Sequence, residues 1–213
     1  MPRKVTIVVG LDLAGSPKRP TGFCLLRGLT AETADLLGDD AILHAVLGAE
    51  AAVVAIDAPL SLPPGRSSIH ERNDSHYRTC DLELRRRKIP FFPITLGPMR
   101  GLTERGMRIR SELEAKGIRV IEIYPGGAQD VWGIPRARRN QAGLRRGLMR
   151  LGLKGLKKEA SDHELDAASG ALVARLFLQG RAEVYGNFES GAIVMPAFGI
   201  FSGRASRARR PRV

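Results

Sequence analysis

The chain has 213 residues, of which 43% are hydrophobic and only 5% aromatic. That length suits one domain with an aliphatic core, and no run approaches the roughly 18 apolar residues that a membrane span needs. The two cysteines, Cys24 and Cys80, form no CxxC pair and no disulfide framework, and the amino terminus shows no small-residue cleavage site. We therefore expect reduced thiols and a cytoplasmic protein.

The charge is strongly basic, with a formal net charge of +12. Such an excess favours polyanionic partners, nucleic acid above all, through phosphate neutralisation and counterion release. The basic residues cluster at 85–88, 136–139, 145–150 and in the tail 201–213. We expect this tail to be disordered because it has almost no apolar content. An arginine-rich surface without a nucleic-acid role remains the alternative, and the oligomeric state is not predicted.

The first half of the chain predicts three strands, a helix and a fourth strand. A strand at 4–12 is followed by a Gly- and Pro-rich turn and a return strand at 21–28. A short edge strand at 32–37 precedes a helix of about ten residues, with Asp39 and Asp40 as N-cap and first-turn acids. The run 51–57 is continuously hydrophobic up to Asp57, as in a buried parallel strand.

The second half predicts a loop-rich segment and then alternating helices and strands. Prolines and glycines in 58–101 indicate an insertion beside the site, with a basic helix around 78–88. An amphipathic helix at 102–116 ends at Gly117, and a strand follows at 118–124. The basic stretch 136–158 should be partly helical, and an Ala-rich final helix should run from about 161 to 179.

This element order is that of the RNase H-like fold. We therefore expect an α/β domain over residues 1–200 with a mixed five-stranded sheet of order 3-2-1-4-5. The second strand would run antiparallel to the others, and helices would cover both faces of the sheet.

Acidic residues recur at the carboxyl ends of the predicted strands. Asp12 and Asp57 end two neighbouring parallel strands, and Glu122 lies in the next one. Ligands of α/β sheets bind at this edge, where an ionised carboxylate is costly unless it is paired or bound to a metal. Neighbouring strands lie about 4.8 Å apart, so Asp12 and Asp57 could share a cation.

The final helix adds a second group of candidates. Asp162 and Asp166 are spaced i, i+4, and His163 and Asp166 are spaced i, i+3, so one helix face can present them to the strand ends. Oxygen donors favour Mg²⁺ or Mn²⁺ over Zn²⁺. Two such ions about 3.5–4 Å apart could activate a water and stabilise the leaving oxygen of a phosphodiester.

Each candidate also has a structural interpretation. Asp12 and Asp57 could form turns at the strand ends. Glu122 could pair with a nearby arginine. Asp162 could be a first-turn acid that interacts favourably with the helix dipole. His163 could be a ligand, a proton shuttle or a surface residue. These alternatives stay open at this point.

Several strings of the chain occur together in one family: GLDLAG, AIDAPLSLP, RTCDLELR, VIEIYPGG, DHELDAASGALVA and GAIVMP. Over about residues 5–196 the chain resembles uncharacterised proteins usually described as predicted RNase H-like nucleases. The resemblance implies an RNase H-like fold and a metal-dependent nuclease activity. It also implies that Asp12, Asp57 and Asp166 match the superfamily acids of the first strand, the fourth strand and the final helix.

The same resemblance bears on four further positions. His163 to Asp166 reads as the H-x-x-D helix motif of RuvC-type resolvases and their relatives. Arg78, Asp81 and Arg85 match the family's own motif, and we assign them a contact with substrate or phosphate.

The sequence therefore predicts a metal-dependent phosphodiesterase of nucleic acid that uses Mg²⁺ or Mn²⁺. Asp12, Asp57 and Asp166 would be the primary metal ligands. Glu122 and Asp162 would be secondary ligands or groups that support the ligands, and His163 would be a proton-transfer residue. Two alternatives come from other classes. Actin-like sugar kinases share this core and also use acids on the first and fourth strands, although they normally pair two such domains. The other alternative is a non-catalytic nucleic-acid binder in which the acids are structural.

Overall fold

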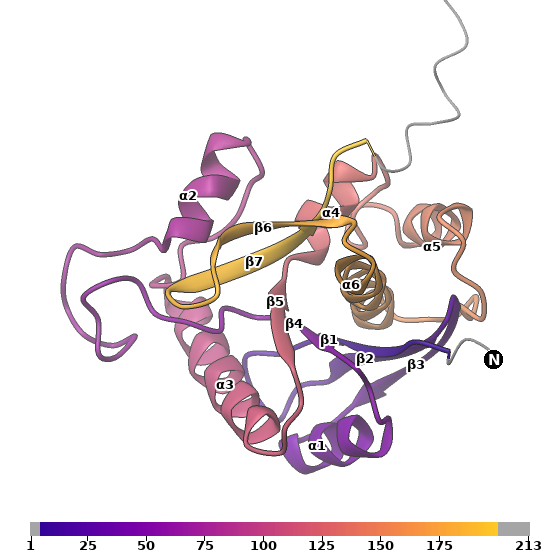
Figure 1. Ribbon diagram of the computed structural model, residues 1–213, viewed down its shortest axis with the longest axis horizontal. Helices are drawn as coiled ribbons and strands as arrows, with labels where there is room; N and C mark the ends of the chain where they lie inside the picture. The colour runs from indigo at the N-terminus through magenta and orange to yellow at the C-terminus, as the bar shows by residue number, and fades with distance from the viewer. Residues whose placement is uncertain (1–4, 200–213) are drawn as a thin grey trace, which may run out of the picture.

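The computed structural model describes residues 5–199 (Figure 1). Their helices and strands follow in the order β1 (Ile7–Asp12), β2 (Thr21–Arg27), β3 (Thr30–Leu36), α1 (Asp39–Gly48), β4 (Val54–Asp57), α2 (Thr79–Arg86), α3 (Gly97–Glu114), β5 (Val120–Ile123), α4 (Pro125–Val131), α5 (Gln141–Arg150), α6 (Asp162–Leu178), β6 (Ala182–Asn187) and β7 (Gly191–Pro196). The predicted tail 201–213 lies outside the described residues.

The strands form one mixed sheet of order β3-β2-β1-β4-β5-β7-β6. Strands β4, β5 and β7 run parallel to β1, whereas β2 and β6 run antiparallel to their neighbours. The first five strands have the order expected from the sequence. The expectation of only five strands needs correction, because the hairpin of β6 and β7 extends the sheet beyond β5.

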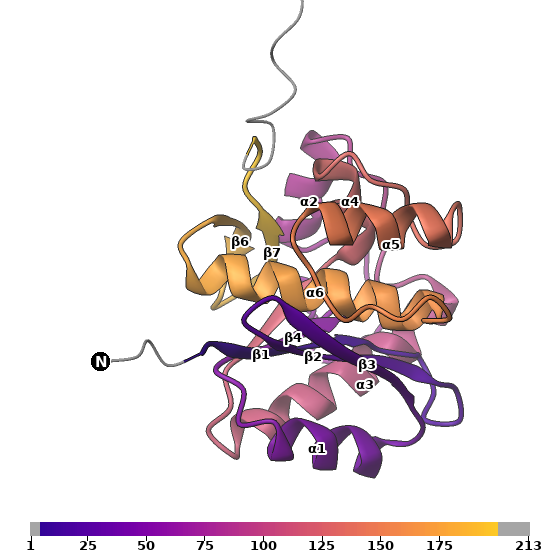
Figure 2. The same cartoon turned by 90° about the vertical axis from the view of Figure 1, so that its right-hand side faces the viewer.

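Helices cover both faces of the sheet (Figure 2). On one face α6 packs along β1 and β2, with α4 and α5 packed beside it. On the other face α1 and α3 supply the core residues Ile42, Val46, Ile109 and Leu113. Helix α2 packs on the hairpin of β6 and β7. No helix within residues 5–199 is long and apolar enough to cross a lipid bilayer.

Strand alternation decides which side chains meet α6. Val9 and Leu11 of β1 belong to the core under α1 and α3, so Val8, Gly10 and Asp12 point to the α6 face. The last residue of β1 is therefore aimed at the helix that carries the other acidic cluster.

Two glycines allow α6 to lie close on the sheet. A Cβ at Gly10 would overlap the carbonyl oxygen of Ala167 and would lie 2.6 Å from the backbone nitrogen of Ala171. A Cβ at Gly22 would overlap the carbonyl group of His163. Only backbone without a side chain fits here, so these glycines set the distance between the acids of β1 and those of α6.

We expect Gly10→Ala to lower the free energy of unfolding by about 1–3 kcal/mol or more, because α6 must shift away from β1. Chemical denaturation monitored by circular dichroism measures this loss. Gly48→Ala is the matched control, since a Cβ there meets nothing within 4 Å and alanine favours the helix. Equal stability of the two variants would contradict the close-packing argument.

Several predicted boundaries need correction. Helix α3 begins at Gly97 rather than 102, because Pro98 is accommodated in its first turn. Gly38 rather than Asp39 is the N-cap of α1. Asp39 instead forms ion pairs with Arg105 and Arg108 of α3. The segment 58–101 thus holds α2 and the start of α3 as well as loops.

Candidate active site

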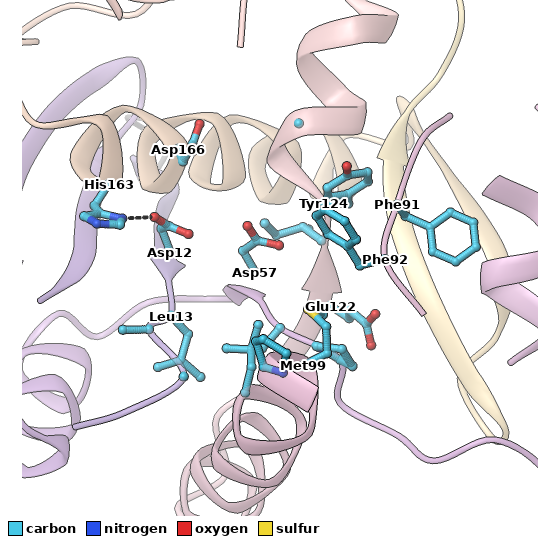
Figure 3. A pocket seen from close by; sticks show the side chains of 18 of the residues that line it. Asp12, Leu13, Asp57, Phe91, Phe92, Met99, Glu122, Tyr124, His163 and Asp166 are labelled. Atoms are coloured by element: carbon cyan, nitrogen blue, oxygen red, sulfur yellow. Dashed lines mark hydrogen bonds and ion pairs between the residues drawn. The ribbon is translucent and has the colours of Figure 1, made fainter. Parts of the chain in front are cut away.

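Asp12 and Asp57 stand side by side at the carboxyl edge of the sheet. They are register partners at the ends of β1 and β4, and both project toward the α6 face (Figure 3). Asp166 lies on α6 across from them, one turn after Asp162 and His163. The structure therefore brings together the three aspartates that the sequence favoured as ligands.

These residues line a cleft of about 600 Å³. Its acidic end is formed by Asp12, Asp57, Asp162, His163 and Asp166. An apolar wall is formed by Leu13, Phe91, Phe92, Ile94, Met99, Leu102 and Tyr124, and a basic rim by Arg19, Arg136, Arg138 and Arg139. Arg78, Asp81 and Glu122 also line the cleft. The cleft combines acids, aromatic rings and guanidinium groups within the size range of ligand-binding sites.

The carboxyl groups destabilise one another's charge. Burial raises the pKa of Asp57 well above its ordinary value, and the charges of Asp12 and Asp166 raise it further. Burial likewise raises the pKa of Asp166 to about 7, with Asp12 again adding to the shift. The ionised form of this cluster is unfavourable unless positive charge is added, and a divalent cation or protons can supply that charge.

His163 is held by Asp12. Its Nδ1 lies 2.6 Å from Oδ2 of Asp12, and its side chain is 33% exposed. The hydrogen bond to Asp12 raises the pKa of His163. The pair can therefore hold a proton at the mouth of the cleft.

Gln129 orients Asp166 from behind. Its Nε2 donates to Oδ1 of Asp166 at 2.6 Å and to Oγ of Ser169 at 3.0 Å. Gln129 is 1% exposed, and within residues 5–199 its Oε1 has no hydrogen-bond partner. Helix α4 thus fixes the rotamer of the α6 carboxylate.

Glu122 does not join the aspartate cluster. Its register partner on β4 is Ile56, which faces the α1 and α3 side, so Glu122 points to the opposite face from Asp57. Figure 3 shows its carboxylate turned away from Asp12 and Asp57. Both of its oxygens accept from Arg78 at 2.7 Å, and Oε2 also accepts from the backbone of Leu60. These contacts match the alternative of pairing with an arginine.

Arg78 and Asp81 form a buried ionic network with Glu122. All five N–H donors of Arg78 are used, on Asp81, Glu122 and Ser61. Asp81 also accepts from the backbone nitrogen of Arg78 at the start of α2. These contacts give Arg78 and Asp81 a structural role and leave Arg78 no donor for a phosphate. Arg85 is exposed and lies 5.9 Å from the ring centre of Tyr77, and its substrate contact stays a prediction.

The donor set suits a hard cation, although the side chains do not yet enclose one. Among residues 5–199, no three His, Cys, Asp or Glu side chains converge as a metal site. Asp12 is turned to His163 and Asp166 to Gln129. All three aspartates nevertheless line one cleft and offer oxygen ligands, which Mg²⁺ and Mn²⁺ prefer.

Sequence reasoning missed Gln129, Phe92 and Tyr124. A lone glutamine carries no motif, and α4 itself was not expected within the stretch after Tyr124. The arginines at 136–139 were noted as a basic cluster but not placed at the cleft. Their position depends on how the segment between α4 and α5 folds back over the strand ends.

Comparisons with known proteins give one family. A search of curated proteins returns no match. A comparison with protein families matches residues 10–190, most of the chain, to the family described as "Protein of unknown function (DUF429)". The matched range contains Asp12, Asp57, His163 and Asp166. The chain therefore belongs to the DUF429 family.

Proposed function

We propose that this protein is a divalent-metal-dependent phosphodiesterase acting on nucleic acid, built on an RNase H-like sheet. The main observation in support is that Asp12, Asp57 and Asp166 line one cleft. Burial and mutual repulsion there raise the pKa of Asp57 and Asp166. The charge of Glu122, by contrast, is balanced by a direct ion pair with Arg78, whereas within residues 5–199 Asp57 and Asp166 have no such ion pair.

The element order supports an RNase H-like assignment. Strands β3-β2-β1-β4-β5 follow that fold's order, with the acids at the ends of its first and fourth strands and on the last helix. The hairpin of β6 and β7 is an addition at the edge beyond β5. It leaves the acidic edge of β1 and β4 unchanged.

Asp12, Asp57 and Asp166 would hold Mg²⁺ or Mn²⁺, and Asp162, one turn earlier on α6 and in the same cleft, would be a secondary ligand. Such an ion, when bound, supplies an activated water and stabilises the leaving oxygen of a phosphodiester. The protein's own side chains would orient the ligands, hold a proton and bind the phosphate backbone. Gln129 orients Asp166, and His163 holds a proton next to Asp12. Arg138 and Arg139 offer guanidinium groups to a phosphate backbone at the rim.

The test is metal-dependent cleavage of nucleic acid by the full chain. We expect the wild type to cleave in Mn²⁺ and to be inactive in EDTA. Asp12→Asn should reduce cleavage by more than about 100-fold, because changing even an outer-shell group at a metal site typically costs 10–100-fold. Asparagine can still accept the hydrogen bond from His163, so the fold should persist.

Asp40→Asn is the matched control, because Asp40 is exposed in the first turn of α1 and does not line the cleft. Unchanged cleavage by Asp12→Asn would contradict the proposed metal-dependent activity. Nucleotide-dependent thermal stabilisation without cleavage would favour the phosphoryl-transfer alternative. Binding that persists in EDTA without any cleavage would favour a non-catalytic binder.

A further inference from the structure

We propose that the cleft takes an unpaired nucleotide, so that the protein acts on single-stranded nucleic acid, with the base stacked on Phe92. This inference rests on the proposed function and names its substrate class. It is drawn from the apolar wall and the basic rim rather than from the aspartates.

Phe92 is an exposed ring inside a cleft. Its exposed fraction is 68%, the highest of the large apolar side chains in residues 5–199, and it lines the same cleft as Asp57 and Tyr124. Figure 3 shows the Phe92 ring on the side of Tyr124 and Asp57, whereas the Phe91 ring points the other way. An exposed aromatic ring beside a phosphate-cleaving centre is suited to stack a base, because every base has an apolar face.

The segment that carries Phe92 is fixed at both ends. The hydroxyl of Tyr124 donates to the carbonyl oxygen of Pro90 at 2.6 Å. Phe91 packs edge-on against Tyr77, with ring centres 6.1 Å apart, and Ile94 is only 1% exposed. The chain on either side of Phe92 is thus anchored while its ring stays in solvent. A ring held in this way loses little entropy on stacking.

The rim of the same cleft supplies positive charge from two segments of the chain. Arg19 comes from the β1–β2 loop, and Arg138 and Arg139 come from the segment between α4 and α5. Within residues 5–199 the guanidinium groups of these three arginines have no ion pair or hydrogen bond, whereas Arg136 is bound to Asp130 and Tyr124. Unpaired guanidinium groups from two segments that line one cleft suit binding of a phosphate backbone.

The arrangement discriminates against a duplex. Stacking on Phe92 needs a free base face, and in a double helix both faces of an internal base are covered by its neighbours. A cleft of about 600 Å³ also matches a nucleotide-sized ligand better than a whole duplex. The base would lie on the aromatic wall and its phosphate would reach the aspartates.

Fluorescence anisotropy with labelled 12-mers tests the inference on the full chain. The probes are single-stranded DNA, single-stranded RNA, duplex DNA and an abasic single strand, at about 150–200 mM salt to suppress non-specific contacts. We use Asp12→Asn as the background so that no probe is cleaved. Single strands should bind more tightly than both the duplex and the abasic strand, and the DNA and RNA probes identify the sugar preference.

On that background Phe92→Ala should weaken single-strand binding by roughly 5- to 140-fold, the equivalent of one lost base–aromatic stack. Binding of the abasic strand should not change, and Phe92→Trp should restore affinity. Phe188→Ala is the matched control, because Phe188 is also exposed but does not line the cleft.

Two outcomes separate this inference from the proposed function. Cleavage by wild type that is equally fast on duplexes and unaffected by Phe92→Ala overturns the inference and leaves the phosphodiesterase intact. Phe92-dependent binding of single strands by a wild-type protein that never cleaves in Mn²⁺ or Mg²⁺ supports the inference and overturns the phosphodiesterase. Absence of any single-strand preference overturns the inference.

Discussion

Arg78→Met should lower the free energy of unfolding by about 3–5 kcal/mol, the usual cost of removing one partner from a buried ion pair. Arg78 is 1% exposed and neutralises Glu122 and Asp81, which are themselves buried. Methionine fills much of the volume but leaves both carboxyl groups without a counterion. This loss is a large share of the total free energy of unfolding of a typical domain, so we expect a large fall in the denaturation midpoint.

Arg86→Met is the matched control for this loss. Arg86 pairs with Glu83 on the same helix, but its side chain is 68% exposed, so its removal should cost less than about 1 kcal/mol. Adding Glu122→Gln to Arg78→Met removes one stranded charge and should recover part of the stability. A loss no larger for Arg78→Met than for Arg86→Met would contradict a structural role for the network.

Asp57→Asn should have opposite effects on stability and activity. In EDTA it should raise the free energy of unfolding, because it removes a buried carboxyl group whose ionisation is opposed by burial and by the charges of Asp12 and Asp166. The same change removes a ligand from the proposed metal site. Cleavage in Mn²⁺ should therefore fall to background.

The order of stabilities should reverse when metal is added. At a Mn²⁺ concentration of about 100 times its dissociation constant, the wild type gains about 2.7 kcal/mol, whereas Asp57→Asn gains little. Denaturant unfolding in EDTA and in Mn²⁺ measures both states of both proteins. A wild type that is more stable than the variant in EDTA, or an equal response of the two to Mn²⁺, would count against the account.

The position of Asp12 and Asp57 could be predicted from the sequence because both acids end continuous apolar strands. Parallel neighbours place such ends together, and the structure makes the two residues register partners. Strand alternation in β5 also predicts that Glu122 lies apart from Asp12 and Asp57. It lies between Ile121 and Ile123, whose side chains enter the core under α6, so alternation sends Glu122 to the other face.

Other features depend on contacts that no local pattern records. The string GAIVMP is a fully buried strand, but its place beside β5 follows from a hairpin that returns after α6. Gln129 becomes important only because α4 packs against α6, and Phe92 only because its neighbours on both sides are anchored. Periodicity and composition describe one segment at a time, so tertiary placement of this kind escapes them.

Anomalous diffraction at the manganese edge, from crystals of the full chain grown with Mn²⁺, tests whether Asp12, Asp57 and Asp166 hold a metal. We expect a peak bounded by carboxylate oxygens of Asp12, Asp57 and Asp166, with the side chains of Asp12 and Asp166 turned toward it. The same crystals of Asp57→Asn should lose that peak. Manganese bound elsewhere, with these three carboxylates left as they are in Figure 3, would contradict the proposed metal site.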